Sequence, residues 1–229
     1  MKKKILAMLA IVAIAVTTIV TPVLAANAPP ALKNQATLNK LVKNAKGKPE
    51  DVIKIATTQK GYKGVKYGGR LHTWFTDKTG TAILNAQKTG TGAWCSEFAT
   101  WCLTQAKVPG AKMCASNGDI AKLYKNAAYK VSSSQNKSGY KDRANKYFKN
   151  NGLKAKDTLT LGALKKGDIL IIDHYGNGLC HTVIFDHAAK VNGKWKVYVV
   201  EGNNGNIVKI QSTYEPYQVG CAFRPNYNK

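Results

Sequence analysis

A cysteine, a histidine, an acid and an amide occur in this chain at positions that favour joint chemistry. Cys95 stands where an apolar helical pattern begins, His181 opens a strand pattern, and Glu201 and Asn203 close the strand pattern that follows. A thiol nucleophile needs a base within hydrogen-bond reach and a group that orients this base. The four residues therefore predict nucleophilic cleavage of an amide bond.

The start of a helix suits Cys95 to this role. Unpaired N–H groups and the helix dipole favour thiolate over thiol, and the same N–H groups can hold an oxyanion. Glu97 lies in the same turn, where a carboxylate caps N–H groups. Cys102 lies on nearly the same helical face, but in mid-helix, and we expect it to be a core residue or part of a disulfide.

The base and its supporting group are expected at strand ends. His181 is placed so that its ring can lean over the helix end, whereas His174 and His187 are expected to be solvated. Glu201 and Asn203 are two positions apart, so in a strand they share a face and either one can accept the ring N–H. Taken without His181, Glu201 is an ordinary strand end and Asn203 a turn residue.

Five cysteines leave at least one thiol unpaired. The count is compatible with one reactive thiol and up to two disulfides, and equally with five reduced cysteines. A zinc site built on Cys180 and His181 has no supporting ligand spacing. We therefore expect no metal and no cofactor.

The surrounding pattern predicts an α+β fold in which N-terminal helices pack on a C-terminal antiparallel β-sheet. A long loop with one short helix at 81–87 is expected over 64–92, and smaller helices and loops over 113–162. An Asn-Gly turn at 192–193 predicts a β-hairpin. Helices are expected near 49–60, 94–106, 119–124 and 141–151, and strands at 169–172, 181–188, 196–200, 207–211 and 220–224.

The N-terminal stretch predicts export. Residues 1–25 combine three lysines, an apolar run and small residues at a cleavage site, which is typical of a secretory signal peptide. An uncut signal anchor is the alternative. Residues 26–48 are expected to be a basic leader or tether, and 49–229 a single catalytic domain. The predicted location is outside the cell or in the cell wall, with membrane contact only through the signal segment.

The formal net charge is +23, and the lysines are dispersed along the chain. Such a protein accumulates on polyanions, and for an exported protein these are the phosphate- or carboxylate-bearing polymers of a cell wall. No nucleic-acid-binding module is recognisable, so no specific nucleic acid is expected. The alternative is that the lysines only confer solubility.

Four stretches together resemble the CHAP family, the cysteine- and histidine-dependent amidohydrolases/peptidases that cut bacterial peptidoglycan. They are the helix around Val52-Ile53-Lys54-Ile55-Ala56, Trp94-Cys95-Ser96-Glu97-Phe98, Gly167-Asp168-Ile169-Leu170, and His181-Thr182-Val183-Ile184 with Glu201-Gly202-Asn203. The resemblance implies a papain-like fold, Cys95 as nucleophile, His181 as base, and Glu201 with Asn203 as the supporting pair. Cys180 departs from the pattern, since a glycine is usual before the histidine, and no separate wall-binding domain is recognisable.

The sequence thus predicts an exported, monomeric cysteine amidase or endopeptidase of peptidoglycan. Two other functions stay open: a non-catalytic basic cell-wall-binding protein on the same fold, and an effector amidase with a substrate outside the wall. The bond that is cut also stays open.

Overall fold

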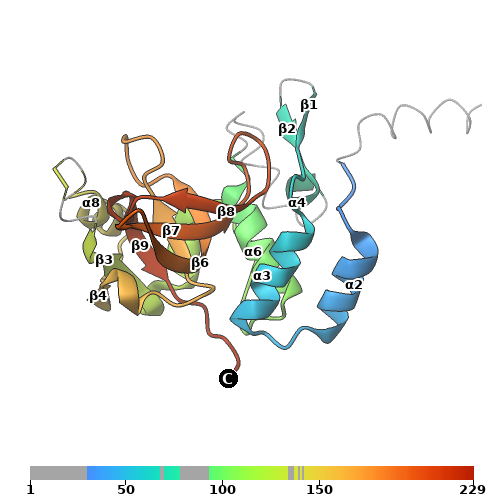
Figure 1. Ribbon diagram of the computed structural model, residues 1–229, viewed down its shortest axis with the longest axis horizontal. Helices are drawn as coiled ribbons and strands as arrows, with labels where there is room; N and C mark the ends of the chain where they lie inside the picture. Colours follow the sequence, from blue (N-terminus) through green and yellow to red (C-terminus); the bar gives the residue numbers. More distant parts are fainter. Residues whose placement is uncertain (1–29, 68–69, 78–92, 134–136, 139, 141) are drawn as a thin grey trace, which may run out of the picture.

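The computed structural model describes residues 30–67, 70–77, 93–133, 137–138, 140 and 142–229 (Figure 1). Its α-helices are α2 (Gln35–Asn44), α3 (Pro49–Thr58), α4 (Trp74–Asp77), α6 (Cys95–Gln105), α7 (Asn117–Leu123) and α8 (Arg143–Asn150), with short 3₁₀ turns η1 (Lys125–Ala127), η3 (Leu161–Ala163) and η4 (Pro216–Gln218). Its strands are β1 (Val65–Tyr67), β2 (Arg70–His72), β3 (Ala128–Val131), β4 (Asp157–Leu159), β5 (Ile169–Ile172), β6 (His181–Val191), β7 (Lys194–Glu201), β8 (Lys209–Tyr214) and β9 (Val219–Phe223).

Seven strands form the main sheet, in the order β4-β3-β9-β5-β6-β7-β8. All neighbouring pairs are antiparallel except β3 and β4, which are parallel, so the sheet is mixed. Strands β5 to β8 follow one another as a meander, whereas β9 returns to lie between β3 and β5. The expected wholly antiparallel sheet is corrected in this respect, while the α+β class is confirmed.

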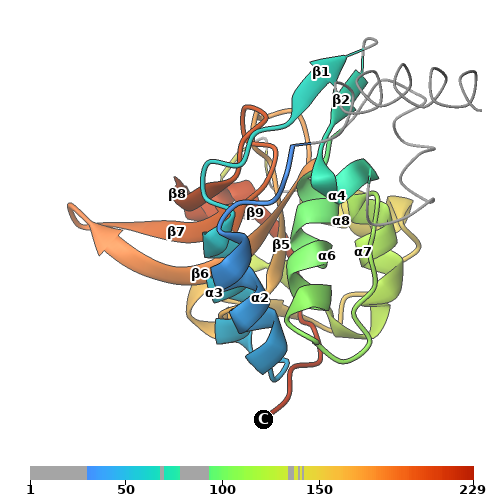
Figure 2. The ribbon, with the colours of Figure 1, turned by 90° about the vertical axis from the view of Figure 1, so that its right-hand side faces the viewer.

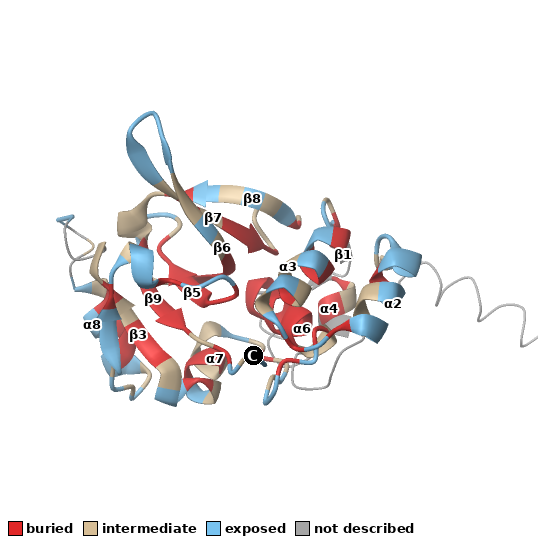
Figure 3. Cartoon of the chain, turned by 60° about the horizontal axis from the view of Figure 1, so that its bottom comes forward, coloured by how far each residue is buried: buried red, intermediate tan, exposed pale blue. Residues whose placement is uncertain are grey.

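The helices pack on one face of this sheet. Residues that alternate along each strand point to opposite faces, so the sheet contributes to two separate cores. Ile169, Ile171 and Ile184 belong to the core that includes α3, α6, α7 and α8. Leu170, Val183 and Phe185 belong to a second core, formed by the other face together with Leu159 at the end of β4 and Leu164 in the segment before β5. Figures 1 and 2 show the helices gathered beside the sheet, and Figure 3 shows the buried residues where the two meet.

An aromatic cluster holds α6 in place. Phe75 of α4 lies 5.6 Å from Trp94, 5.1 Å from Phe98 and 5.1 Å from Trp101, measured between ring centroids. Each of these side chains is at most 2% exposed, and burial of each contributes about 1.5–3 kcal/mol. Gly202, directly after β7, allows the closest approach, since a Cβ there would lie 2.6 Å from Trp94 and 2.7 Å from Phe98.

Most predicted elements are present, but two regions differ. The range 64–92, expected to be a long loop, contains β1, β2 and α4. The short helix expected at 81–87 lies outside the described residues. The region 113–162, expected to hold only helices and loops, also contributes β3 and β4 to the sheet. These strands of four and three residues are stabilised by pairing with distant partners, which leaves little local pattern to detect.

The described part of the predicted leader is docked onto the domain. Leu38 of α2 is 2% exposed and joins the core beside α3, and Gln59 bonds both the N–H and the C=O of Lys33 at 2.9 Å. The apolar face of this helix covers α3, so this range is a helix packed on the domain. The predicted signal peptide, 1–25, lies outside the described residues. Within the described part of the chain, no helix has the length and apolar character needed to cross a membrane.

Candidate active site

Helix α6 presents Cys95 at its first position, as predicted. The first backbone hydrogen bond of the helix runs from the N–H of Phe98 to the C=O of Trp94. The N–H groups of Cys95 and Ser96 precede this bond and therefore point out of the helix end. The thiol is 4% exposed and lies beside the start of β6.

Strand β6 brings His181 to this helix end. His181 is the first residue of the strand and pairs with Ile172 of β5. The next residue in each element forms a second contact, since the hydroxyls of Ser96 and Thr182 lie 2.9 Å apart and are buried. The helix start and the strand start are thus joined at two consecutive positions.

His181 contacts Cys95 and Glu201 at the same time. Its Nε2 lies 2.7 Å from Oε2 of Glu201, and its side chain is near enough to the Cys95 thiol for the two groups to shift each other's pKa. Because the ring has two nitrogens and Nε2 faces the carboxylate, Nδ1 is the one left for the sulfur. His181 is 9% exposed and Glu201 is 1% exposed, so both side chains are largely shielded from water.

The electrostatics of these three groups support an ion pair. Burial acts to raise the pKa of the Cys95 thiol, but the hydrogen bond and charge of His181, with further hydrogen bonds from the Thr182 backbone and Ser96, lower it below the usual range. Burial acts to lower the pKa of His181, yet its contacts with Cys95 and Glu201 raise it to about 9. At neutral pH these directions favour thiolate and imidazolium.

Glu201 is held ionised by several donors. Asn204 Nδ2 donates to its Oε1 at 2.7 Å, and the Tyr214 hydroxyl donates to its Oε2 at 2.7 Å. Burial acts to raise the pKa of this carboxyl, but the hydrogen bonds from His181, Ser212 and Tyr214 and the charge of His181 lower it to about 2. A carboxylate fixed in this way can orient the imidazole and stabilise its positive form.

His174 is the third ring of the cluster, after His181 and Tyr214. Its Nδ1 lies 2.9 Å from the Tyr214 hydroxyl, and its ring centroid lies 5.5 Å from that of His181. The single hydroxyl proton of Tyr214 goes to Glu201, so His174 donates from Nδ1–H. Burial and the nearby charge of His181 lower the pKa of His174, which keeps it neutral. His174 is partly exposed, as expected of a loop residue, but it is also hydrogen-bonded within the cluster, which was not expected.

Glu201, and not Asn203, contacts the histidine. Strand β7 ends at Glu201, and Asn203 lies beyond it with a positive φ of 63°. The alternation that would place both side chains on one face stops at the strand end. Among the described residues no hydrogen bond joins Asn203 to His181 or Cys95, so a role for Asn203 stays a prediction.

Glu97 is buried and neutral. It is 2% exposed, and burial together with the nearby Cys95 raises its pKa to about 9. Its carboxyl accepts a hydrogen bond from its own backbone N–H, as a residue of the first turn can, while Oε2 has no partner.

The other thiols differ sharply from Cys95. All five cysteines are free, and burial raises the pKa of Cys102, Cys114, Cys180 and Cys221. Cys102 is fully buried, as a core residue should be, whereas Cys180 is exposed. Cys95 is therefore the one cysteine whose surroundings favour the thiolate.

Sequence reasoning missed Asn204, Tyr214 and His174. Asn204 was visible only as part of a turn, and Tyr214 and His174 follow no spacing that relates them to Glu201. Within the described ranges, no group of three or more His, Cys, Asp or Glu side chains is arranged to hold a metal ion.

Comparisons with known proteins identify no relative: the chain matches no family model, no curated protein and no solved structure.

Proposed function

We propose that this protein is a cysteine amidohydrolase or peptidase with a papain-like fold that cleaves an amide bond in bacterial peptidoglycan. The observation that carries the proposal is the series Cys95–His181–Glu201, in which His181 is hydrogen-bonded to Glu201, the thiol pKa is lowered and the imidazole pKa is raised. The resemblance of the surrounding motifs to the CHAP family supports the substrate class, as does the net charge of +23.

The reaction begins with attack of the Cys95 thiolate on the amide carbonyl carbon, which forms a C–S bond and places negative charge on the oxygen. The N–H groups of Cys95 and Ser96 are available to stabilise this oxyanion. His181, as imidazolium, donates its Nδ1 proton to the amine as the C–N bond breaks, which leaves a thioester and neutral imidazole.

Hydrolysis completes the cycle. Neutral His181 removes a proton from water, whose oxygen attacks the thioester carbonyl. The C–S bond breaks, the acid is released, and the thiolate–imidazolium pair is restored. Glu201 keeps the imidazole oriented throughout and stabilises its positive form. No redox step is needed, because every step is a proton or acyl transfer.

Purified peptidoglycan provides the test. We expect the wild-type protein to release fragments and new amines, and mass spectrometry of the fragments to identify the bond. Cys95→Ala should lose this release by a factor on the order of 10³ or more while keeping its circular dichroism spectrum. Cys180→Ser is the matched control, because Cys180 is a neighbouring exposed thiol with a raised pKa.

The outcomes separate the alternatives. A folded Cys95→Ala variant that still releases fragments would overturn the proposal. Rapid labelling of Cys95 by a thiol reagent without release from walls would favour an effector amidase with another substrate. Absence of both, with salt-sensitive adhesion to walls, would favour a non-catalytic binding protein.

A further inference from the structure

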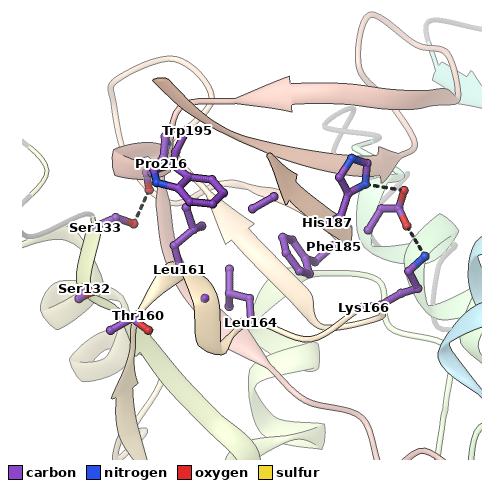
Figure 4. Close-up of a pocket in the computed structure, with 13 residues that line it drawn as sticks. Ser132, Ser133, Thr160, Leu161, Leu164, Lys166, Phe185, His187, Trp195 and Pro216 are labelled. Atoms are coloured by element: carbon purple, nitrogen blue, oxygen red, sulfur yellow. Dashed lines mark hydrogen bonds and ion pairs between the residues drawn. The ribbon is translucent and has the colours of Figure 1, made fainter. Parts of the chain in front are cut away.

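A second concave surface lies on β6 and β7, away from the thiol. It is a groove of about 610 Å³ whose lining includes Leu161, Leu164, Phe185 and Trp195. This volume falls within the range of about 300–1,000 Å³ that is typical of ligand sites. Figure 4 shows Trp195 at one side, Phe185 at the other, and the two leucines between them. We call this surface the β6–β7 groove.

The β6–β7 groove lies on the same sheet face as His181. Phe185 follows His181 by four positions in β6, and Val183 and Phe185 both belong to the core on this face. Four residues of strand span roughly 13 Å. A polymer bound at the candidate active site therefore reaches the groove if it extends about 13 Å further along β6.

Trp195 is the distinctive side chain of the groove. It is 48% exposed, whereas Trp94 and Trp101 are at most 2% exposed. Figure 3 shows that the outer half of the β6–β7 hairpin, which carries it, stands away from the helices. Lys190 Nζ lies 5.6 Å from the centroid of its ring. A large aromatic surface left partly exposed at the wall of a groove is a site for stacking.

The charged groups that line the groove are already paired, whereas Lys190 lies outside the lining, over the Trp195 ring. Lys166 Nζ lies 2.9 Å from Oδ1 of Asp186, and Asp186 Oδ2 lies 3.1 Å from Nδ1 of His187; Figure 4 shows both contacts. Lys196, on the same hairpin, is paired with Glu215. On a chain of net charge +23, this pairing argues for a neutral ligand and against an anionic one.

The polar groups of the groove are side chains. Strand β6 pairs with β5 only over His181–Ile184, and β7 pairs with β8 only over Val197–Glu201, so the outer half of the hairpin is paired within itself. The hydroxyls of Thr160 and Ser132 lie at the rim of the apolar floor. A flat ring with one apolar face and polar groups around its edge matches this combination.

We propose that the β6–β7 groove binds a neutral carbohydrate chain, with a sugar ring stacked on Trp195. The choice of an N-acetylated sugar as the probe rests on the proposed function, whereas the groove itself does not depend on Cys95. The groove would supply wall affinity within the catalytic domain, in addition to the attraction of the basic surface for anionic polymers.

The test uses the full chain carrying Cys95→Ala and a neutral oligomer of N-acetylglucosamine. We expect calorimetry to detect binding that changes less than about twofold when salt rises from about 0.1 to 0.5 M, since no ion pair is involved. Tryptophan emission should shift, because Trp195 is the strongly exposed indole. Trp195→Ala should weaken binding by about tenfold or more, consistent with the loss of one stacked ring.

Val191→Ala is the matched control, because Val191 is 40% exposed on the same hairpin and does not line the groove. It should bind as the parent does. Neutral lipid vesicles are tested in parallel with the oligomer. The proposal is overturned if the oligomer does not bind, if Trp195→Ala binds it equally well, or if the vesicles shift the Trp195 emission and the oligomer does not. None of these outcomes affects the reactivity of Cys95, so failure here is distinct from failure of the proposed hydrolase activity.

Discussion

The hydroxyl of Tyr214 donates to Oε2 of Glu201 at 2.7 Å, and the same oxygen lies 2.7 Å from Nε2 of His181. One carboxylate oxygen thus accepts from a phenol and an imidazole together. This arrangement stabilises the ionised carboxylate and restricts its rotation, so the imidazole that faces Cys95 is oriented from behind.

The lowered thiol pKa predicts selective alkylation of Cys95. At about pH 6.5, iodoacetamide should modify Cys95 well before Cys180, although Cys180 is the exposed thiol, because burial raises the Cys180 pKa. Peptide mass spectrometry after timed labelling measures both sites in one sample. Faster labelling of Cys180 at this pH would contradict the ion pair.

Replacing the carboxylate should move the pH profile. In Glu201→Gln the negative charge is lost, so the pKa of His181 falls from about 9 and that of Cys95 rises. The alkaline limb of activity should move to lower pH, the alkylation midpoint to higher pH, and activity should fall by about 10²–10⁴-fold.

Tyr214→Phe is the graded counterpart, because it removes one hydrogen bond and keeps the ring. We expect a loss of about 1 kcal/mol, or roughly fivefold in activity, without the downward shift of the alkaline limb, because the negative charge of Glu201 is kept. A Glu201→Gln profile identical to wild type would show that the carboxylate is only structural.

Glu97 should make stability depend on pH. Its folded-state pKa is raised to about 9, and its unfolded-state pKa is about 4.3. The contribution of Glu97 to the free energy of unfolding is therefore fully present below about pH 4.3. The contribution is lost as pH rises toward 9, by up to about 1.4 kcal/mol per pH unit. Glu97→Gln lacks this titration and should gain stability relative to wild type between pH 5 and pH 8. Urea unfolding of both proteins at the two pH values gives the difference; a constant difference would rule out the neutral carboxyl.

Gly202 should tolerate no side chain. A Cβ there would meet Trp94 and Phe98 at less than 3 Å, and overpacking of this kind costs about 1–3 kcal/mol. Thermal unfolding of Gly202→Ala should therefore show a clear drop in Tm. Gly162→Ala is the control, because a Cβ at Gly162 meets nothing within 4 Å. Equal Tm values for the two variants would contradict the close packing of α6 on the end of β7.

Local patterns predicted the elements that carry the reactive groups. The apolar spacing after Cys95 predicted α6, and the Asn-Gly turn predicted the β6–β7 hairpin, in which Asn192 and Gly193 have the positive φ values that such a turn requires. Positions at element ends then indicated Cys95, His181 and Glu201, which the fold brings together.

The remaining features depend on contacts between distant segments. His174 and Tyr214 meet only through the arrangement of β5, β6 and β8, and no spacing in the chain relates them. Strands β3 and β4 are too short to show alternation, and the docking of α2 depends on a surface that α3 provides. Asn203 shows the opposite failure: strand alternation was extended two residues past Glu201, where the strand ends.

The buried hydroxyl pair of Ser96 and Thr182 sits one residue beyond Cys95 and His181 in both elements. The spacing between helix and sheet is consequently set by atoms that take no part in the chemistry. Removing the sulfur or the imidazole should leave this spacing unchanged, and an inactivated protein should then hold uncleaved substrate in the geometry of the working one. Such variants would serve as traps with which the natural substrate can be captured intact.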